Sequence, residues 1–304
     1  MTDFIVEVQG LCVQFGSFFA VKDVSFCVPR GEIFGFLGAN GAGKTTTIRV
    51  ICGLLPATKG SVIVDGEPFL PGREDRIKAK VGYMSQRFTL YEDLTVGENL
   101  DFAAMLHQVS GALYKQRKED LFAMIQFNRT ERTMVADLPS GTKQQVALVA
   151  SLIHDPNLVV LDEPTAGVSP VSRQKFWELI HQLAAKGKTI FVTTHYMDEA
   201  ENCNRIVLMR SGEIIALGTP KDLEKETFPK PMFRLLPKSD LSTEQLKNFK
   251  EQCELFMPYG RYFHVIFPKE GLVPPLFQEH FSVESIAPSL EDVFIQKVEG
   301  DRSW

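Results

Sequence analysis

The octapeptide GANGAGKT, residues 38–45, is the feature that most limits how this chain can fold. The apolar run EIFGFL comes directly before it, and KTTTIRVICGLL follows with apolar spacing that suits a helix. The octapeptide fits the pattern GxxxxGK[ST], in which the backbone of a glycine-rich loop wraps a polyphosphate at a helix start. The sequence therefore predicts a phosphate-binding loop between a strand and a helix.

Each part of this loop has an expected task. The glycines at positions 38, 41 and 43 let backbone N–H groups approach a phosphate closely. Lys44 would reach the β- and γ-phosphates, and Thr45 would offer its hydroxyl to Mg²⁺. The residues of this segment expected to bind the nucleotide are Gly38, Ala39, Asn40, Gly41, Ala42, Gly43, Lys44, Thr45 and Thr46.

A second motif, LVVLDEP, covers residues 158–164. Its four apolar residues predict a buried strand, and two acids follow where the strand would leave the sheet. Ligands of such sheets bind at that edge. We expect Asp162 to organise Mg²⁺ and Glu163 to polarise the attacking water.

Two further polar residues follow predicted strands. His195 comes directly after KTIFVTT and would leave the same sheet on the same side as Asp162, where it would contact a γ-phosphate. Gln86 ends the segment VGYMSQ and could reach either the Mg²⁺ or the attacking water.

The pattern of strands and helices predicts an α/β fold with a parallel sheet flanked by helices. Residues 1–228 would form the main domain, with short strands and Gly-containing turns near the N-terminus and a mainly helical segment at about 87–155. Beyond Phe228, prolines at 229 and 231 interrupt regular structure. Residues 229–304 would then form a small α+β accessory domain, with helices over TEQLKNFKEQCELF and PSLEDVFIQKVEG and a strand at RYFHVIF.

Composition excludes several classes of protein. A net charge of -5 and a pI near 5.8 argue against a nucleic-acid binder, which usually shows a basic surface. The five scattered cysteines fit inert thiols in a reducing compartment. The N-terminal MTDFIVEVQG does not resemble a signal peptide, and no apolar run approaches the ~18 residues of a membrane span. If this protein acts at a membrane, another chain must cross it.

Taken in this order, the motifs resemble those of the ATP-binding subunit of an ABC transporter, over roughly residues 3–225. The resemblance implies a P-loop NTPase core with an antiparallel β subdomain, an ATPase activity, and ATP and Mg²⁺ as ligands. It makes Gln86 the Q-loop glutamine, Asp162 and Glu163 the Walker B pair, and His195 the switch histidine. The Mg²⁺ ligands would be Thr45, Gln86 and Asp162.

The family also stacks an upstream aromatic ring on adenine. Phe15 matches this position best, and Phe18 and Phe19 are alternatives.

The segment LPSGTKQQ, residues 138–145, stands where the family carries its signature sequence. Pro139 replaces a serine, Ser140 replaces the first glycine, and Gly141 and Gln144 keep the usual residues. We expect Ser140 to supply a hydroxyl and the N–H groups of Ser140, Gly141 and Thr142 to remain available for an anion. Ser169 likewise replaces an aspartate of the family, and Asn204 another.

The resemblance implies particular partners. Such subunits dimerise head to tail, so the signature residues Pro139, Ser140, Gly141 and Gln144 would cap ATP on the other subunit. The partner would be a second copy or a different ATP-binding subunit. A separate integral-membrane permease would contact Arg87–Phe102, placing the chain peripherally on the cytoplasmic face of the bacterial inner membrane. The end motif PSLEDVFIQ resembles exporters of drugs, antibiotics, lipids or polysaccharides.

Alternative functions remain at this level. The altered signature could leave a regulatory subunit that binds ATP but hydrolyses it weakly. A soluble ABC protein of translation or DNA repair usually has two nucleotide modules or a coiled-coil insertion, and this chain has neither. The C-terminal segment does not suit an ATPase that assembles metal clusters.

Overall fold

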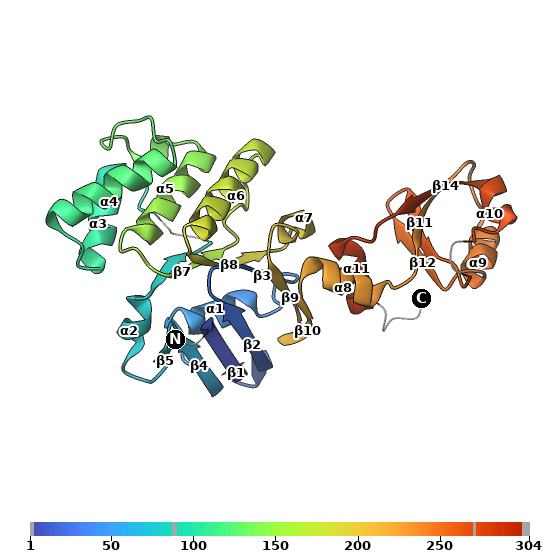
Figure 1. Ribbon diagram of the computed structural model, residues 1–304, viewed down its shortest axis with the longest axis horizontal. Helices are drawn as coiled ribbons and strands as arrows, with labels where there is room; N and C mark the ends of the chain where they lie inside the picture. The colour runs from blue at the N-terminus through green and yellow to red at the C-terminus, as the bar shows by residue number, and fades with distance from the viewer. Residues whose placement is uncertain (1–2, 87–89, 270–271, 300–304) are drawn as a thin grey trace. The chain divides into compact units, whose positions relative to one another are not determined.

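The computed structural model describes residues 3–86, 90–269 and 272–299 (Figure 1). It separates the chain into two compact units, residues 1–220 and 221–304. The division lies before the expected boundary at residue 228, because helix α8 (Pro220–Thr227) falls almost wholly in the C-terminal unit. Residues 87–89, at the start of the expected helical segment and of the expected permease contact, lie outside the described residues.

A six-stranded sheet forms the centre of the N-terminal unit, in the order β10-β9-β3-β8-β7-β6. Its strands are β3 (Ile33–Leu37), β6 (Val81–Met84), β7 (Leu158–Asp162), β8 (Thr189–Thr194), β9 (Arg205–Arg210) and β10 (Glu213–Gly218). The pairs from β9 to β6 are parallel, and the edge strand β10 pairs with β9 antiparallel. Strands β3, β7 and β8 are buried along their whole length, as continuous strands of a covered parallel sheet are.

The register of this sheet places the predicted motifs at one edge. Leu37, the last residue of β3, pairs with Thr194 of β8, and Asp162 of β7 pairs with Thr193. Met84 of β6 pairs with Leu161. Because parallel strands end at the same edge, the segments that follow β3, β6, β7 and β8 meet there.

A second, antiparallel sheet completes the core of this unit. It has the order β2-β1-β4-β5 and contains β1 (Phe4–Phe15), β2 (Phe18–Pro29), β4 (Lys59–Val64) and β5 (Glu67–Pro68). Helix α1 (Lys44–Ile51) contacts strands of both sheets. The ring of Phe26 lies 5.7 Å from that of Phe34 and 6.2 Å from that of Phe191, so the two sheets share one buried core. The predicted P-loop α/β fold with an antiparallel β subdomain is confirmed.

Helices fill the segment between β6 and β7. They are α3 (Val96–Leu106), α4 (Gly111–Met124), the 3-10 turn η1 (Val135–Asp137) and α5 (Ser140–Leu152). A capping box starts α3, in which Thr95 accepts from the backbone N–H of Glu98 and Glu98 accepts from that of Thr95. The remaining helices of this unit are α2 (Glu74–Lys78), α6 (Pro170–Ala185) and α7 (Met197–Ala200).

The C-terminal unit contains a four-stranded antiparallel sheet in the order β12-β13-β11-β14. Its elements are β11 (Met232–Pro237), α9 (Thr243–Glu251), β12 (Leu255–Tyr259), β13 (Tyr262–Ile266), α10 (Pro275–His280), β14 (Phe281–Ile286) and α11 (Leu290–Glu299). The helix expected over TEQLKNFKEQCELF ends at Glu251, and the last residues of that stretch begin β12. β11 is an interior strand of this sheet that the sequence did not predict. Pro231 precedes it and Pro237 is its last residue, and prolines normally argue against an interior strand. None of the described helices has the length and apolar character needed to cross a membrane.

Candidate active site

The loop after β3 has a backbone that its glycines make possible. Gly38, Gly41 and Gly43 all have positive φ, at 152°, 81° and 107°. A Cβ on Gly38 would lie 2.3 Å from the carbonyl oxygen of Met209, and one on Gly43 would lie 2.5 Å from that of Ala20. Glycine is therefore required at 38 and 43 by packing as well as by conformation.

Lys44 begins helix α1, and its side chain is only 5% exposed. Its Nζ donates to the carbonyl oxygens of Gly38 and Ala39, at 2.7 and 3.3 Å, so the side chain folds back along the loop. It also lies 3.7 Å from Oε1 of Glu163. Burial lowers the pKa of Lys44, and the neighbouring carboxylates of Glu163 and Asp162 oppose this shift.

Asp162 is the last residue of β7 and is 2% exposed. Its Oδ1 accepts a hydrogen bond from Thr193 Oγ1 at 2.7 Å, and Thr45 Oγ1 lies 3.4 Å from the same oxygen. Burial raises the pKa of Asp162 above its usual value, although the two hydroxyls favour the ionised form. The carboxylate thus faces the first turn of α1 from the neighbouring strand.

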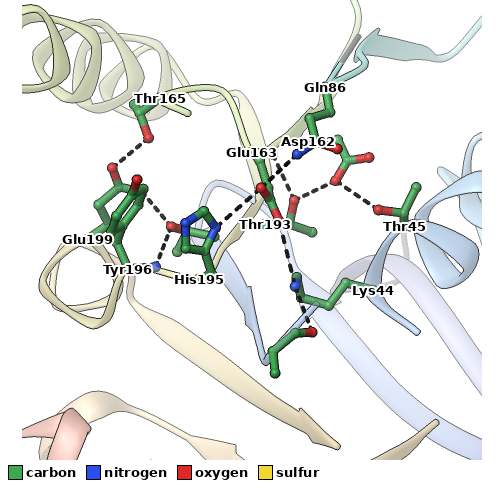
Figure 2. Close-up of polar contacts among 12 residues, drawn as sticks. Lys44, Thr45, Gln86, Asp162, Glu163, Thr165, Thr193, His195, Tyr196 and Glu199 are labelled. Atoms are coloured by element: carbon green, nitrogen blue, oxygen red, sulfur yellow. Dashed lines mark hydrogen bonds and ion pairs between the residues drawn. The ribbon is translucent and has the colours of Figure 1, made fainter. Parts of the chain in front are cut away.

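The carboxylate of Glu163 is the point where the four motifs meet (Figure 2). Oε2 accepts a hydrogen bond from Gln86 Nε2 at 2.8 Å and lies 3.2 Å from Nδ1 of His195. Oε1 faces Lys44. Glu163 has a φ of 49°, an unusual conformation for a residue other than glycine, and its N–H donates to Thr193 Oγ1 at 2.9 Å. This backbone turn brings its side chain into the site.

Phe15 lies apart from the contacts around Glu163. It is the last residue of β1, pairs with Phe18 across the hairpin and is 51% exposed. The part of this hairpin that reaches the loop after β3 is Ala20, whose carbonyl oxygen lies against Gly43. An exposed ring at Phe15 can accept a flat partner.

The signature-like segment forms the start of α5. Pro139 is the N-cap residue, and its carbonyl oxygen accepts hydrogen bonds from the N–H groups of Thr142 and Lys143, both at 2.9 Å. The expectation that Thr142 keeps a free N–H is therefore wrong, because the first turn of the helix uses it. The N–H groups of Ser140 and Gly141 remain the candidates for binding an anion. A cavity of about 290 Å³ opens beside this turn and is lined in part by Pro139 and Gly141.

The two other departures from the family pattern both have structural roles. Ser169 caps α6, because its hydroxyl accepts from the N–H of Ser172 at 3.3 Å. Oδ1 of Asn204 accepts from the N–H of Ile33 at 2.8 Å and so holds the start of β3.

Sequence reasoning missed Thr193, which bonds both Asp162 and the backbone of Glu163. The only sign of it is the pair of threonines before His195, and nothing in the sequence shows which of them faces β7.

Comparison with known proteins gives consistent matches. Residues 21–166 match the family model described as ABC transporter. The probable multidrug ABC transporter ATP-binding protein YbhF of Escherichia coli K12 is 42% identical over 223 residues, which cover 73% of this chain but 38% of that protein. The Nod factor export ATP-binding protein I of Bradyrhizobium diazoefficiens is 34% identical over 97% of both chains.

Solved structures agree with these relatives. An ATP-binding cassette, solved as a dimer in a post-hydrolysis state with ADP and Pi, superposes with a TM-score of 0.64. It is 25% identical, and the match covers 70% of this chain and 98% of that one. This chain thus spans less than half of the E. coli relative but nearly all of the Bradyrhizobium protein and of the solved cassette.

Proposed function

Because this chain belongs to the family of ABC transporter ATP-binding proteins, we propose that it binds and hydrolyses ATP to power export through a separate membrane permease. One observation carries the enzymatic part of this proposal. Glu163 stands next to the buried Asp162, and the side chains of Lys44, Gln86 and His195 converge on its carboxylate. A carboxylate that three side chains position at a phosphate site can accept the proton of an attacking water.

ATP would bind along the loop after β3. Backbone N–H groups from Gly38 to Thr46 would surround the phosphates at the N-terminus of α1, where the helix dipole favours negative charge. Lys44 would exchange its carbonyl partners and Glu163 for the β- and γ-phosphate oxygens. Phe15 would stack on the adenine ring, in keeping with its exposed position.

The donor set at the ends of α1, β6 and β7 fits Mg²⁺. Thr45 offers a hydroxyl oxygen, Asp162 a carboxylate and Gln86 an amide oxygen, because the amide nitrogen of Gln86 faces Glu163. Mg²⁺ prefers such hard oxygen ligands and usually completes its shell with phosphates and water. When bound, the ion would neutralise charge on the β- and γ-phosphates.

The residues of this chain would then carry out hydrolysis in one step. Water attacks the γ-phosphorus, the bond from this phosphorus to the β–γ bridging oxygen breaks, and the proton of the water passes to Glu163. Gln86 and His195, which flank the Glu163 carboxylate, would hold the water and the γ-phosphate in line. Lys44 would stabilise the negative charge that develops on the phosphate oxygens.

The second half of each site would come from another ATP-binding subunit. Ser140 and Gly141 at the start of α5 would present N–H groups, and Ser140 a hydroxyl, to a γ-phosphate held by the partner. Pro139 and Gln144 belong to the same first turns of α5. The dimeric state of the solved cassette supports this arrangement, and we favour a homodimer of this chain.

The names of the relatives support an exporter. YbhF is called a probable multidrug protein, and the Bradyrhizobium protein is named for Nod factor export. This chain would act on the cytoplasmic face of the membrane, bound to a permease that carries the substrate path.

The test uses purified wild-type protein and the variant Glu163→Gln. Wild-type protein should release phosphate from ATP only with Mg²⁺, and Glu163→Gln should slow this by about 10²-fold or more. The variant should still bind ATP and should change from monomer to dimer in solution when ATP is added. Lys44→Ala is the matched control, since it should lose both binding and dimerisation.

Two results would contradict the proposal. Full hydrolysis by Glu163→Gln would show that another group accepts the proton. A variant that binds ATP but stays monomeric, even with a purified permease, would show that LPSGT does not close a partner site.

A further inference from the structure

Arg173 lies in the first turns of α6, outside every motif that the proposed function uses. Its guanidinium carbon stands 4.1 Å from the centre of the Tyr196 ring, within the range of a cation–π contact. Its Nε lies 3.3 Å from Oε1 of Glu199, as an ion pair rather than a well-aligned hydrogen bond. Nη1 is 3.7 Å from the exposed carboxylate of Asp198.

Glu199 gives this arginine a fixed anchor. It is 2% exposed, and one of its carboxylate oxygens accepts a hydrogen bond from Thr165 Oγ1 at 2.5 Å (Figure 2). The other accepts a hydrogen bond from Thr194 Oγ1 at 2.6 Å. Thr165 follows the Walker B pair, and Thr194 is the residue before His195. The buried carboxylate therefore ties Arg173 to the segments after β7 and β8.

Tyr196 transmits this anchoring to His195. Its N–H donates to Thr194 Oγ1 at 3.0 Å, and its ring lies 4.1 Å from the imidazole of His195, centre to centre. The His195 side chain is 36% exposed and lies 3.2 Å from Glu163. The Tyr196 ring is therefore one of the two neighbours, with Glu163, that orient this imidazole.

The same turn of α6 also touches the signature segment. A Cβ on Gly141 would lie 2.6 Å from Oγ of Ser172, so the start of α5 packs closely on the residue before Arg173. Ser172 bonds in turn to Ser169, the cap of the helix. The first turns of α6 thus lie between two functional segments. One is the start of α5, which would cap a partner's nucleotide, and the other is the segment after β8, which would contact the nucleotide of this subunit.

We propose that Arg173 is a positioning residue for His195: anchored by Glu199, it packs on Tyr196 and holds the imidazole opposite Glu163. This inference rests on the proposed ATPase function, and its test separates the two.

The first measurement does not need activity. The six histidines are labelled with ¹³C in their rings, and the His195 signal is assigned by its absence in His195→Ala. Arg173→Met should move the His195 signal and leave the His264 and His280 signals of the C-terminal unit in place. Tyr196→Leu should do the same without removing Arg173, whereas Tyr196→Phe, which keeps the ring, should match wild type. An unmoved His195 signal in both Arg173→Met and Tyr196→Leu would overturn the proposal.

The second measurement is a double-mutant cycle in ATP hydrolysis. Arg173→Met should lower kcat about tenfold to a hundredfold and leave KM for ATP within about twofold, because geometry changes while the nucleotide contacts stay. In the His195→Ala background the same change should cost less than about twofold. Equal costs in both backgrounds would show a general structural effect. Arg173→Lys keeps the charge but not the planar group, so its kcat should lie between those of wild type and Arg173→Met.

Lys186→Met, at the far end of α6, is the control for removing an exposed cation from this helix, and it should behave as wild type. A wild-type protein without ATPase activity, alone or with a permease, would refute the proposed function, while the histidine spectra would still decide the role of Arg173.

Discussion

The change Asp162→Asn should make the nucleotide-free protein more stable and should weaken its binding of MgATP. Asp162 is buried, and burial raises its pKa above the usual value. The unfolded chain therefore loses this proton first, near pH 4, and the folded state is disfavoured as pH rises from there through the folded pKa. Asparagine removes this cost and keeps an oxygen that can accept from Thr193.

The size of the two effects follows from general energetics. Single stabilising substitutions commonly add about 0.5–2 kcal/mol to the free energy of unfolding, and about 1 kcal/mol shifts the melting midpoint of a domain of this size by roughly 2–4 °C. A ligand at a hundred times its Kd adds about 2.7 kcal/mol. If losing the Asp162 charge weakens the binding of MgATP tenfold, the stabilisation by the same concentration of MgATP falls to about 1.4 kcal/mol. The variant should therefore melt higher without MgATP and gain less when MgATP is added.

Differential scanning calorimetry can measure both effects. The transition that MgATP shifts in wild type identifies the N-terminal unit. The matched control is Asp75→Asn, because Asp75 is 96% exposed and its loss should change stability by less than about 0.5 kcal/mol. The advantage of Asp162→Asn should shrink as pH falls toward about 4. A variant less stable than wild type at neutral pH without MgATP would refute the argument from burial.

Two other predictions concern the C-terminal unit and the phosphate loop. Burial opposes ionisation of Asp292, but hydrogen bonds from His264, 2.7 Å away, and from the turn before α11 outweigh it and hold the pKa of Asp292 below its usual value. The stabilisation from ionised Asp292 should be present above about pH 4 and lost as pH falls through its lower folded pKa. The protection factors of the β13 amides, which are corrected for the intrinsic slowing of exchange in acid, should therefore fall over this range, and in Asp292→Asn they should be low already at pH 7. In the loop, Gly38→Ala should abolish ATP binding in equilibrium titrations, because its Cβ would strike the Met209 backbone, whereas Gly41→Ala, with open space around it, should carry only the ~1–2 kcal/mol cost of its positive φ.

The sequence predicts which residues meet at the site because sheet geometry decides it. Once the segments before Gly38, Gln86, Glu163 and His195 are interpreted as parallel strands, their ends must lie along one edge. No side-chain detail is needed for that conclusion. The spacing within each motif then limits which atoms can face the edge.

The finer arrangement depends on contacts that no local pattern shows. Glu163 turns into the site through a positive φ supported by Thr193, which lies on a different strand. Arg173 acquires its partners because the start of α6 lies beside Tyr196 and Glu199, which come after β8 in the sequence. In the C-terminal unit, β11 pairs with β13 and β14, which come later in the chain. The prolines at its ends indicate irregular structure when only the local sequence is considered.

The altered signature is best understood from what the helix start already does. Pro139 occupies the N-cap with φ -57°, which its ring favours, and its carbonyl oxygen accepts the first helical hydrogen bonds. Proline in place of the family's serine therefore preserves this turn, in which Ser140 is exposed, and removes one hydroxyl and one N–H. If this segment caps a partner's nucleotide as proposed, such a change should weaken the contact with the partner's γ-phosphate and leave ATP binding within the same subunit intact, because Pro139 takes no part in the loop after β3. Any loss of activity from this sequence should consequently appear in dimer closure and not in the affinity of the single subunit for ATP.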